Sequence, residues 1–271
     1  MYLDQLQVFI QNGKYLELKQ LEKKLNALRN CIMNYQKSSG QERMVWRKLG
    51  VVGIFTKVNI YEDDRNGLYD HLNNFGLLPH VVNIHWDKLS TDEQEGLESL
   101  TIQRGNYLRY WPNKSQTVSF DEQASEETIL NKQEITEILN EWRIIKWKHD
   151  RLEKQWSLVK KEAVREWGSR DRKIKFSFGT LSLIKLYPQI PTNVILDQLD
   201  MSSLIRSGSV NYEKVYEFAA KGYFNKSDID KFRNIKDVSL RYALMEMFQE
   251  AKRYEYYKRK LNYLSEWSRQ R

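Results

Sequence analysis

The feature that most constrains the fold is a long series of apolar positions in the second half of the chain. Its members recur at alternating spacings of three and four residues, which is the pattern of one helix with a single buried seam. They are Ile135, Ile138, Trp142, Ile145, His149, Leu152, Trp156, Val159 and Ala163. The spacing predicts a helix over about residues 133–168, roughly 50 Å long at 1.5 Å per residue. A helix of that length needs a partner along its seam.

The C-terminal region offers a candidate partner. Apolar residues there repeat the spacing and predict a second long amphipathic helix over about residues 237–268, interrupted by Lys258. They are Leu240, Leu244, Met247, Ala251, Tyr254, Leu261 and Leu264. We therefore expect two long antiparallel helices in the C-terminal half. His149 lies inside the first seam, where a polar residue typically fixes the register or orientation of the partner.

The other segments predict shorter elements. Residues 14–36 have the apolar spacing of a helix packed on a neighbour, and residues 44–61 are rich in the β-branched and aromatic residues of a strand. Two β-like runs flank Pro112 and predict a hairpin over residues 107–120. Alternation of Ile174, Phe176 and Phe178 predicts a short strand. The expected fold is mainly α (α+β with minor β), with a few short strands in the N-terminal half. The expected domains are a mixed region at 1–120 and a helical, basic region at 121–271.

Composition limits the class of protein. The chain has 271 residues and one cysteine, Cys31, so neither an internal disulfide nor a thiolate zinc site can form within it. Its longest apolar run, VVGIF, is far shorter than the ~20 residues that span a membrane. We expect a cytoplasmic protein without membrane contact. The wealth of Lys, Asn, Ile and Tyr suggests an AT-rich genome such as that of a phage or mobile element.

Residues 62–87 look most like a catalytic or metal site, because they contain five acidic residues and three of the four histidines. A cryptic enzyme would use Asp63, Asp64, His71 and His80. However, the acids fit the capped first turn of a helix, and His80 and His85 are five residues apart, which places them on opposite faces of a strand. A structural interpretation is therefore favoured, with no metal and no cofactor.

Sequence motifs do not favour catalysis. The chain has no GxxxxGK[ST], GxGxxG, GxSxG or HExxH motif, and no motif carries a resemblance to a known family. Residues 211–234 have the outline of a helix-turn-helix, but the second helix would begin with acidic residues that repel phosphate. We expect a non-enzymatic protein.

Charge favours a binding protein. Residues 1–140 contain 16 Lys/Arg against 19 Asp/Glu, whereas residues 141–271 contain 28 against 17. Basic side chains neutralise phosphates and exposed aromatic rings stack on bases, so the basic, aromatic C-terminal half predicts nucleic-acid binding, to DNA or RNA. The predicted contacts are Arg143, Lys146, Lys148, Lys160, Lys161, Arg165, Lys252, Arg253, Tyr256, Tyr257, Lys258, Arg259, Lys260, Tyr263 and Trp267.

A second hypothesis is a protein–protein adaptor, an inhibitor or a subunit of a larger assembly, with an acidic protein as partner or with a homo-oligomer held by the long helices. Aromatic residues commonly dominate such interfaces. Its candidate anchors, wherever they are exposed, are Trp142, Trp147, Trp156 and Trp167. The bland alternative is that the aromatic residues fill the helix seams and the charges only face water.

Overall fold

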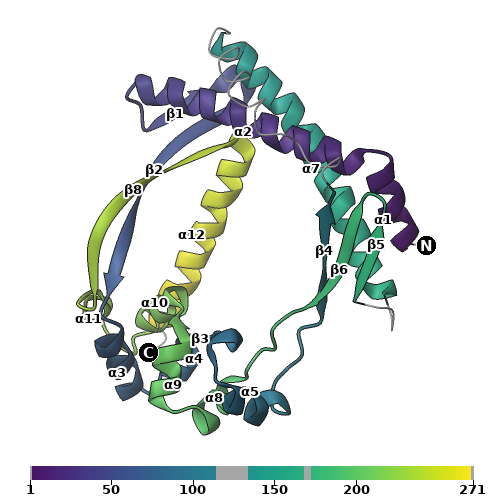
Figure 1. Cartoon of the computed structure of the whole chain (residues 1–271). Helices are drawn as coiled ribbons and strands as arrows, with labels where there is room; N and C mark the ends of the chain where they lie inside the picture. The colour runs from purple at the N-terminus through teal and green to yellow at the C-terminus, as the bar shows by residue number, and fades with distance from the viewer. Residues whose placement is uncertain (1, 114–133, 168–171, 270–271) are drawn as a thin grey trace. The chain divides into compact units, whose positions relative to one another are not determined.

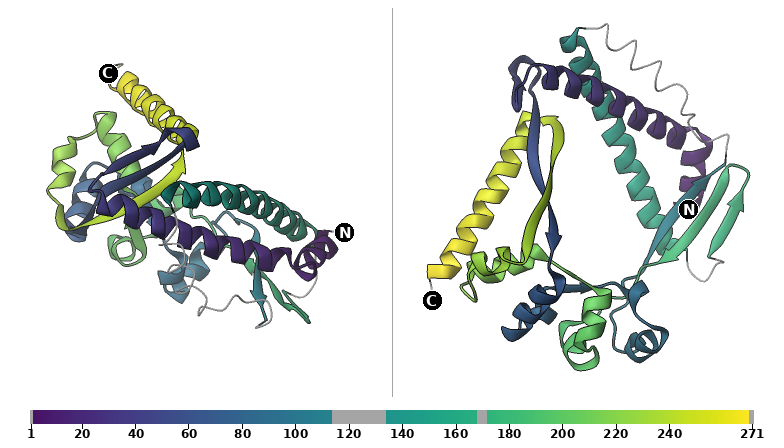
Figure 2. Two further views of the ribbon diagram at one scale, coloured as in Figure 1. Left: turned by 90° about the horizontal axis from the view of Figure 1, so that it is seen from above. Right: turned by 60° about the vertical axis from the view of Figure 1, so that its left-hand side comes forward.

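The long apolar series forms one helix, α7 (Ile135–Glu166), in a computed structural model that describes residues 2–113, 134–167 and 172–269. Members of the series make up most of its buried side, and the rest of the series is partly buried. The helices that pack against α7 are α1 (Tyr2–Gln11) and α2 (Lys14–Ser38), both from the N-terminal end of the chain (Figure 2, left). The predicted seam therefore exists, with a different partner.

The predicted pair of antiparallel helices in the C-terminal half is wrong. Residues Arg233–Glu246 form a 14-residue strand, β8, which lies beside the 13-residue strand β2 (Val51–Asp63). Only at Met247 does the last helix, α12 (Met247–Arg269), begin. The segment of β8 contains β-branched residues and alternates in part, so its local spacing is compatible with either structure. Pairing with β2 satisfies its backbone groups and decides for the strand.

The expected division of helices and strands between the halves is also wrong. Helix α2, with 25 residues, lies in the N-terminal half, whereas several strands, including the longest, lie in the C-terminal half. Figure 1 shows strands in both halves of the colour scale.

The chain folds into two compact units that interleave in sequence. Unit 1 comprises Met1–Phe55, Gly105–Leu186 and Tyr242–Met247, and unit 2 comprises Thr56–Arg104, Tyr187–Arg241 and Phe248–Arg271.

Unit 1 is organised along α7, which contributes to two hydrophobic clusters. The first half of the helix, including Leu139 and Trp142, packs with Leu28 and Ile32 of α2 and with Val51 at the start of β2. The second half packs with α1 and with a three-stranded sheet. There Trp156 lies 5.4 Å from Phe9, 5.1 Å from Tyr15 and 6.2 Å from Tyr110, measured between ring centroids. One helix thus anchors both clusters.

Strand β1 (Arg43–Trp46) pairs with β2, and the 3-10 turn η1 (Arg47–Leu49) joins them.

The three-stranded sheet of unit 1 has the order β4-β6-β5 and is antiparallel throughout. Its strands are β4 (Asn106–Pro112), β5 (Lys173–Phe176) and β6 (Gly179–Lys185). Strand β4 pairs with β6. The second half of the hairpin expected over 107–120 falls on residues 114–120, which lie outside the described residues. One face of the sheet contributes Leu108, Tyr110 and Leu181 to the cluster around Trp156.

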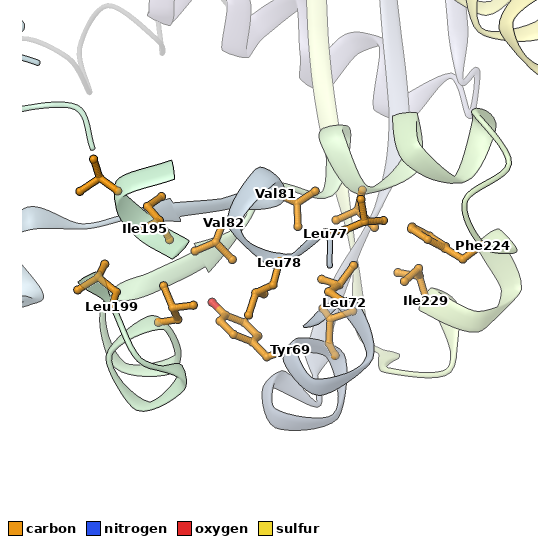
Figure 3. Packing of buried hydrophobic residues seen from close by; sticks show 14 of the residues in the cluster. Tyr69, Leu72, Leu77, Leu78, Val81, Val82, Ile195, Leu199, Phe224 and Ile229 are labelled. Carbon is orange, nitrogen blue, oxygen red and sulfur yellow. The ribbon is translucent and has the colours of Figure 1, made fainter. Parts of the chain in front are cut away.

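Unit 2 is a helical layer around one hydrophobic cluster, shown in Figure 3. Leu72 of α3 (Arg65–Asn74), Leu78 of α4 (Leu78–Val81), Ile195 of α8 (Thr192–Gln198) and Ile229 of α11 (Lys226–Asp230) belong to this cluster. The two-stranded sheet β3-β7 completes the layer. The other elements that lie wholly within the unit are β3 (Val82–Ile84), η2 (Trp86–Lys88), α5 (Thr91–Glu98), α9 (Met201–Ser207), β7 (Gly208–Val210) and α10 (Tyr212–Ala220). Unit 2 also includes most of β2, β8 and α12.

Replacing Trp156 by alanine tests the role of α7 in unit 1. Trp156 is 5% exposed and touches three aromatic rings, so Trp156→Ala should lower the free energy of unfolding by about 3–5 kcal/mol. The matched control is Trp147→Ala on the same helix, where the side chain is 64% exposed and a loss below about 1 kcal/mol is expected. Urea unfolding measures both. Equal losses for the two variants would contradict the assigned burial.

The hydrogen bonds of Glu93 predict that the stability of unit 2 depends on pH. Although partial burial by itself would raise the pKa of Glu93, hydrogen bonds from the Ser203 hydroxyl, the Ser90 N–H and Arg206 lower this pKa to about 2. A carboxyl group with a lowered folded-state pKa stabilises the fold above its unfolded pKa, and this contribution disappears as the pH falls from about 4.5 towards 2. We expect a loss of about 2 kcal/mol over this window in urea unfolding. In Glu93→Gln, most of that decline should be absent.

Candidate nucleic-acid interface

Most of the basic residues that the sequence predicts on α7 lie on one side of the helix, and Lys148 is the exception. At 100° per residue, Arg143, Lys161 and Arg165 lie within about 40° of one another around the helix axis, whereas Lys148 lies about 140° from Arg143. Several are also engaged locally: the Lys146 ammonium contacts Asp150 at 2.7 Å, Arg165 contacts Glu162 at 2.7 Å, and Lys160 lies over the Trp156 ring at 5.3 Å. The exposed members are Arg143, Lys148, Lys161 and Arg165. Part of the charge of this series is therefore already neutralised by neighbouring acidic residues.

The predicted contacts on α12 belong to unit 2. Tyr256 and Tyr257 are 63% and 59% exposed, and their rings lie edge to face at 5.6 Å. Lys252, Arg253, Lys258 and Arg259 are exposed, whereas Lys260 forms ion pairs with Glu213 and Glu217 of α10. The side chains of Tyr263 and Trp267 lie outside the described residues. Because α7 and α12 belong to different units, the structure gives no joint surface for the two predicted sets.

The histidine-rich stretch forms ordinary structural contacts. His71 lies among Phe75, Phe224 and Phe232, with ring centroids 5.1–6.3 Å away. The Asp64 side chain caps α3 by accepting a hydrogen bond from the Gly67 N–H at 3.1 Å. Asp63 contacts the guanidinium of Arg233 at 3.2 Å. Within residues 2–113, 134–167 and 172–269, no three His, Cys, Asp or Glu side chains are grouped as metal ligands would be.

A basic, aromatic surface occurs where the sequence did not predict one, on the outer face of the β4-β6-β5 sheet. Successive side chains of a strand point to opposite faces, so the residues that alternate with the buried ones share the outer face. We call this set the outer face. It consists of Tyr107, Arg109 and Trp111 on β4, Thr180, Ser182 and Ile184 on β6, and Lys173 and Lys175 on β5.

The strand register arranges these side chains in rows across the sheet. Arg109 of β4 pairs with Ser182 of β6, and Ser182 pairs with Lys173 of β5. In the next row, Trp111 pairs with Thr180, and Thr180 pairs with Lys175. Each row therefore contains a β4 residue with a planar group, a hydroxyl in the centre and an ammonium group on β5. With strands about 4.8 Å apart, a row is about 10 Å wide at the backbone.

An open groove of about 760 Å³ lies over this surface. Six of its lining residues belong to the outer face, and Arg172, Leu183 and Lys185 extend it at the end where β5 begins. None of the described lining residues is acidic. Four of them are basic, namely Arg172, Lys173, Lys175 and Lys185. A groove with lining charges of one sign attracts ligands of the opposite sign, because its field is not cancelled locally.

Two further features of the groove are suited to a ligand. The side chain of Trp111 is 47% exposed, and the guanidinium of Arg109 lies over its ring at 3.7 Å from the ring centroid. Ser182 is 5% exposed, and its hydroxyl has no hydrogen-bond partner among the described residues. A buried hydroxyl normally has a partner, so an unsatisfied one in the lining of a groove marks a place for a polar ligand atom.

The turn between β5 and β6 is fixed to the end of β4. The Tyr110 hydroxyl donates to the carbonyl of Phe178 at 2.8 Å, and the Asn113 side-chain amide donates to the carbonyl of Ser177 at 2.6 Å. Burial raises the pKa of Tyr110 to about 12, which extends the pH range in which its hydroxyl acts as a donor. These bonds hold Trp111 and Lys175 in their relative positions without a ligand.

Sequence reasoning missed this site although one signal was visible. In NYLRYWP the residues Tyr107, Arg109 and Trp111 alternate with Leu108 and Tyr110, and in KIKF the lysines alternate with Ile174 and Phe176. Either strand alone shows two or three polar or aromatic residues on one face. Their meeting depends on the pairing of β4 and β5 with β6, which the sequence does not reveal.

Comparison of the chain with protein-family models, with curated proteins and with solved structures finds no match. In the described part of the chain, every helix is too short or too polar to cross a bilayer. Of the four tryptophans considered as interface anchors, Trp142, Trp156 and Trp167 are at most 5% exposed, whereas Trp147 is exposed.

Replacing Gly179 tests how the β5–β6 turn packs against β4. The φ of Gly179 is +154°, and a Cβ atom there would lie 2.4 Å from the carbonyl oxygen of Trp111 and 2.7 Å from the Tyr110 ring. Gly179→Ala should therefore force the β5–β6 turn away from β4 and lower the free energy of unfolding by about 1–3 kcal/mol.

The control for this substitution is Gly96→Ala in helix α5, where a Cβ atom would meet nothing within 4 Å. Alanine favours a helix interior over glycine by about 0.8–1.0 kcal/mol, so this variant should be slightly more stable than the parent. Opposite signs in urea unfolding are the expected result. A neutral Gly179→Ala would show that the turn is not packed on β4.

Proposed function

We propose that the protein binds nucleic acid, DNA or RNA, through the outer face of the β4-β6-β5 sheet. The observation that carries the proposal is the groove of four basic side chains bordered by an exposed tryptophan, with no acidic residue among the described lining residues. Phosphate binding needs the positive charges, and the aromatic ring supplies a surface for bases. Binding, without a catalytic step, is the proposed activity.

Charge and aromaticity together favour nucleic acid over other anionic partners. An acidic protein could pair with the lysines and pack a side chain on Trp111, but it does not join a planar group to every negative charge. Nucleic acid uses both, because each nucleotide joins a phosphate to a planar base. The hydroxyls of Thr180 and Ser182, in the central strand between the ring and the lysines, add hydrogen-bonding groups suited to phosphate, sugar or base edges.

The basic residues of α12 remain proposed phosphate contacts, in a secondary role. Lys258 and Arg259 are exposed, but Arg259 lies 3.8 Å from Glu255 and the neighbouring Lys260 is paired with acidic residues of α10. Lys173 and Lys175 show no ion pair with another described residue. We therefore expect the outer face to contribute more to affinity than α12.

Charge reversal tests the proposal. Lys173→Glu combined with Lys175→Glu should weaken binding to a labelled oligonucleotide by more than tenfold at 100 mM salt, because two phosphate contacts become repulsive. The slope of log affinity against log salt should become shallower by about 1.5. Fluorescence anisotropy across a salt series measures both quantities. Lys258→Glu with Arg259→Glu should have a smaller effect.

The matched control is Lys37→Glu combined with Lys48→Glu. Both lysines are exposed and belong to unit 1, and the pair changes the net charge by the same amount without touching the groove. Equal weakening by the control and by the groove variant would mean that only net charge matters, and the proposed site would be wrong.

The outward side of α7 gives a second candidate function, a protein–protein interface. Trp147 is 64% exposed, and Ile144 and Leu158 are each 58% exposed on the same side of the helix. Arg151, whose guanidinium lies 5.7 Å from the Trp147 ring, adds a positive charge there. An acidic amphipathic helix would match this stripe in chemistry. Retention of a partner by the parent chain and its loss in Trp147→Ala would support this role.

A further inference from the structure

We infer that the outer face is a single-strand site, which reads unpaired bases by stacking on Trp111 and holds the adjoining phosphates on β5. This inference rests on the proposed nucleic-acid function and adds that the bound nucleic acid is single-stranded. It follows from the position of the aromatic ring, the order of groups within each row and the unsatisfied hydroxyl of Ser182.

The guanidinium of Arg109 covers part of the Trp111 indole, and Trp111 also lines the groove. A guanidinium over a ring holds that ring in place and adds an attractive charge for an electron-rich partner. The exposed indole surface is therefore a stacking platform fixed before a ligand arrives. A base can use it only when its own face is free, which is the case in single strands but not inside a duplex.

A base stacked on Trp111 would have Thr180 beside it and Lys175 beyond, because the register places these three residues in line. The next row offers Ser182 and Lys173 in the same order. The sugar-phosphate backbone of the nucleic acid would thus run near β5, where the ammonium groups lie. Its bases would lie near β4. Tyr107, 41% exposed and paired with Ile184 one row further, extends the aromatic side of the surface.

Ser182 lies between Arg109 and Lys173 in the strand register and is 5% exposed. Its hydroxyl has no hydrogen-bond partner among the described residues. Its surroundings favour an anionic or carbonyl oxygen as its partner, because both cross-strand neighbours are cationic. A phosphate or a base carbonyl of a single strand can reach between two side chains, whereas the stacked interior of a duplex presents only its outer phosphates and groove edges.

The experiment uses the full chain and four probes of equal length labelled with the same dye. The probes are oligo(dT), oligo(U), an abasic oligodeoxynucleotide and a DNA duplex of mixed sequence. Anisotropy titrations at 50 and 150 mM salt are made with the parent chain, Trp111→Ala and Trp111→Phe. Trp147→Ala serves as the matched control, because it removes an exposed indole of unit 1 that does not line the groove.

We expect the parent chain to bind at least one of the two base-bearing single strands at least tenfold more tightly than the abasic strand and the duplex. Trp111→Ala should weaken binding to that strand about tenfold or more and leave binding to the abasic strand within twofold. Trp111→Phe should retain most of the affinity because it keeps a ring. Trp147→Ala should resemble the parent chain. Preference between the two base-bearing probes assigns DNA or RNA.

Two results would overturn the inference, and they are distinguishable from each other. Equal or tighter binding of the duplex, together with an unchanged affinity of Trp111→Ala for single strands, would leave a phosphate-binding face and refute stacking. No binding of any probe at 50 mM salt would refute the proposed function itself. The comparison of base-bearing and abasic strands requires no variant, so it remains decisive if Trp111→Ala fails to fold.

Discussion

Burial of the apolar side of α7 is the interaction on which unit 1 depends. Its first half packs with α2 and the start of β2, and its second half packs with α1 and the inner face of the β4-β6-β5 sheet. Because a helix of this length is a stiff rod, these two clusters are coupled through one element. The sheet is held on one side by the ring cluster of Phe9, Tyr15, Tyr110 and Trp156. Its other side carries the outer face and the groove over it.

The outer face is a direct consequence of that packing. In β4, the strand that gives Leu108 and Tyr110 to the core must present Tyr107, Arg109 and Trp111 on the opposite side. The same rule applies to β5, where Ile174 and Phe176 face inward and the lysines face outward. A binding surface built in this way is as rigid as the core beneath it, so little order has to be gained when a ligand binds.

The sequence permitted a correct prediction of α7, because nine positions with regular spacing define a helix and its buried side with little ambiguity. It did not reveal the partner: α2 has the same spacing as the C-terminal region, and local periodicity does not distinguish between them. The segment of β8 was assigned to a helix because its strand character depends on β2, almost 180 residues earlier. The site was missed for the same reason, since Arg109 and Lys173 are brought together only through Ser182. The chemistry of the side chains could be predicted from the sequence, whereas the register of the strands could not.

The most direct test of the account is to map where a bound single strand touches the protein. Photocrosslinking of the full chain to a short oligonucleotide carrying 4-thiothymidine or 4-thiouridine, followed by mass spectrometry of the peptides, identifies the contacted segments. The account predicts crosslinks in residues 106–112 and 172–185, centred on Trp111. Crosslinks confined to α7 or α12, with none on β4, β5 or β6, would contradict it.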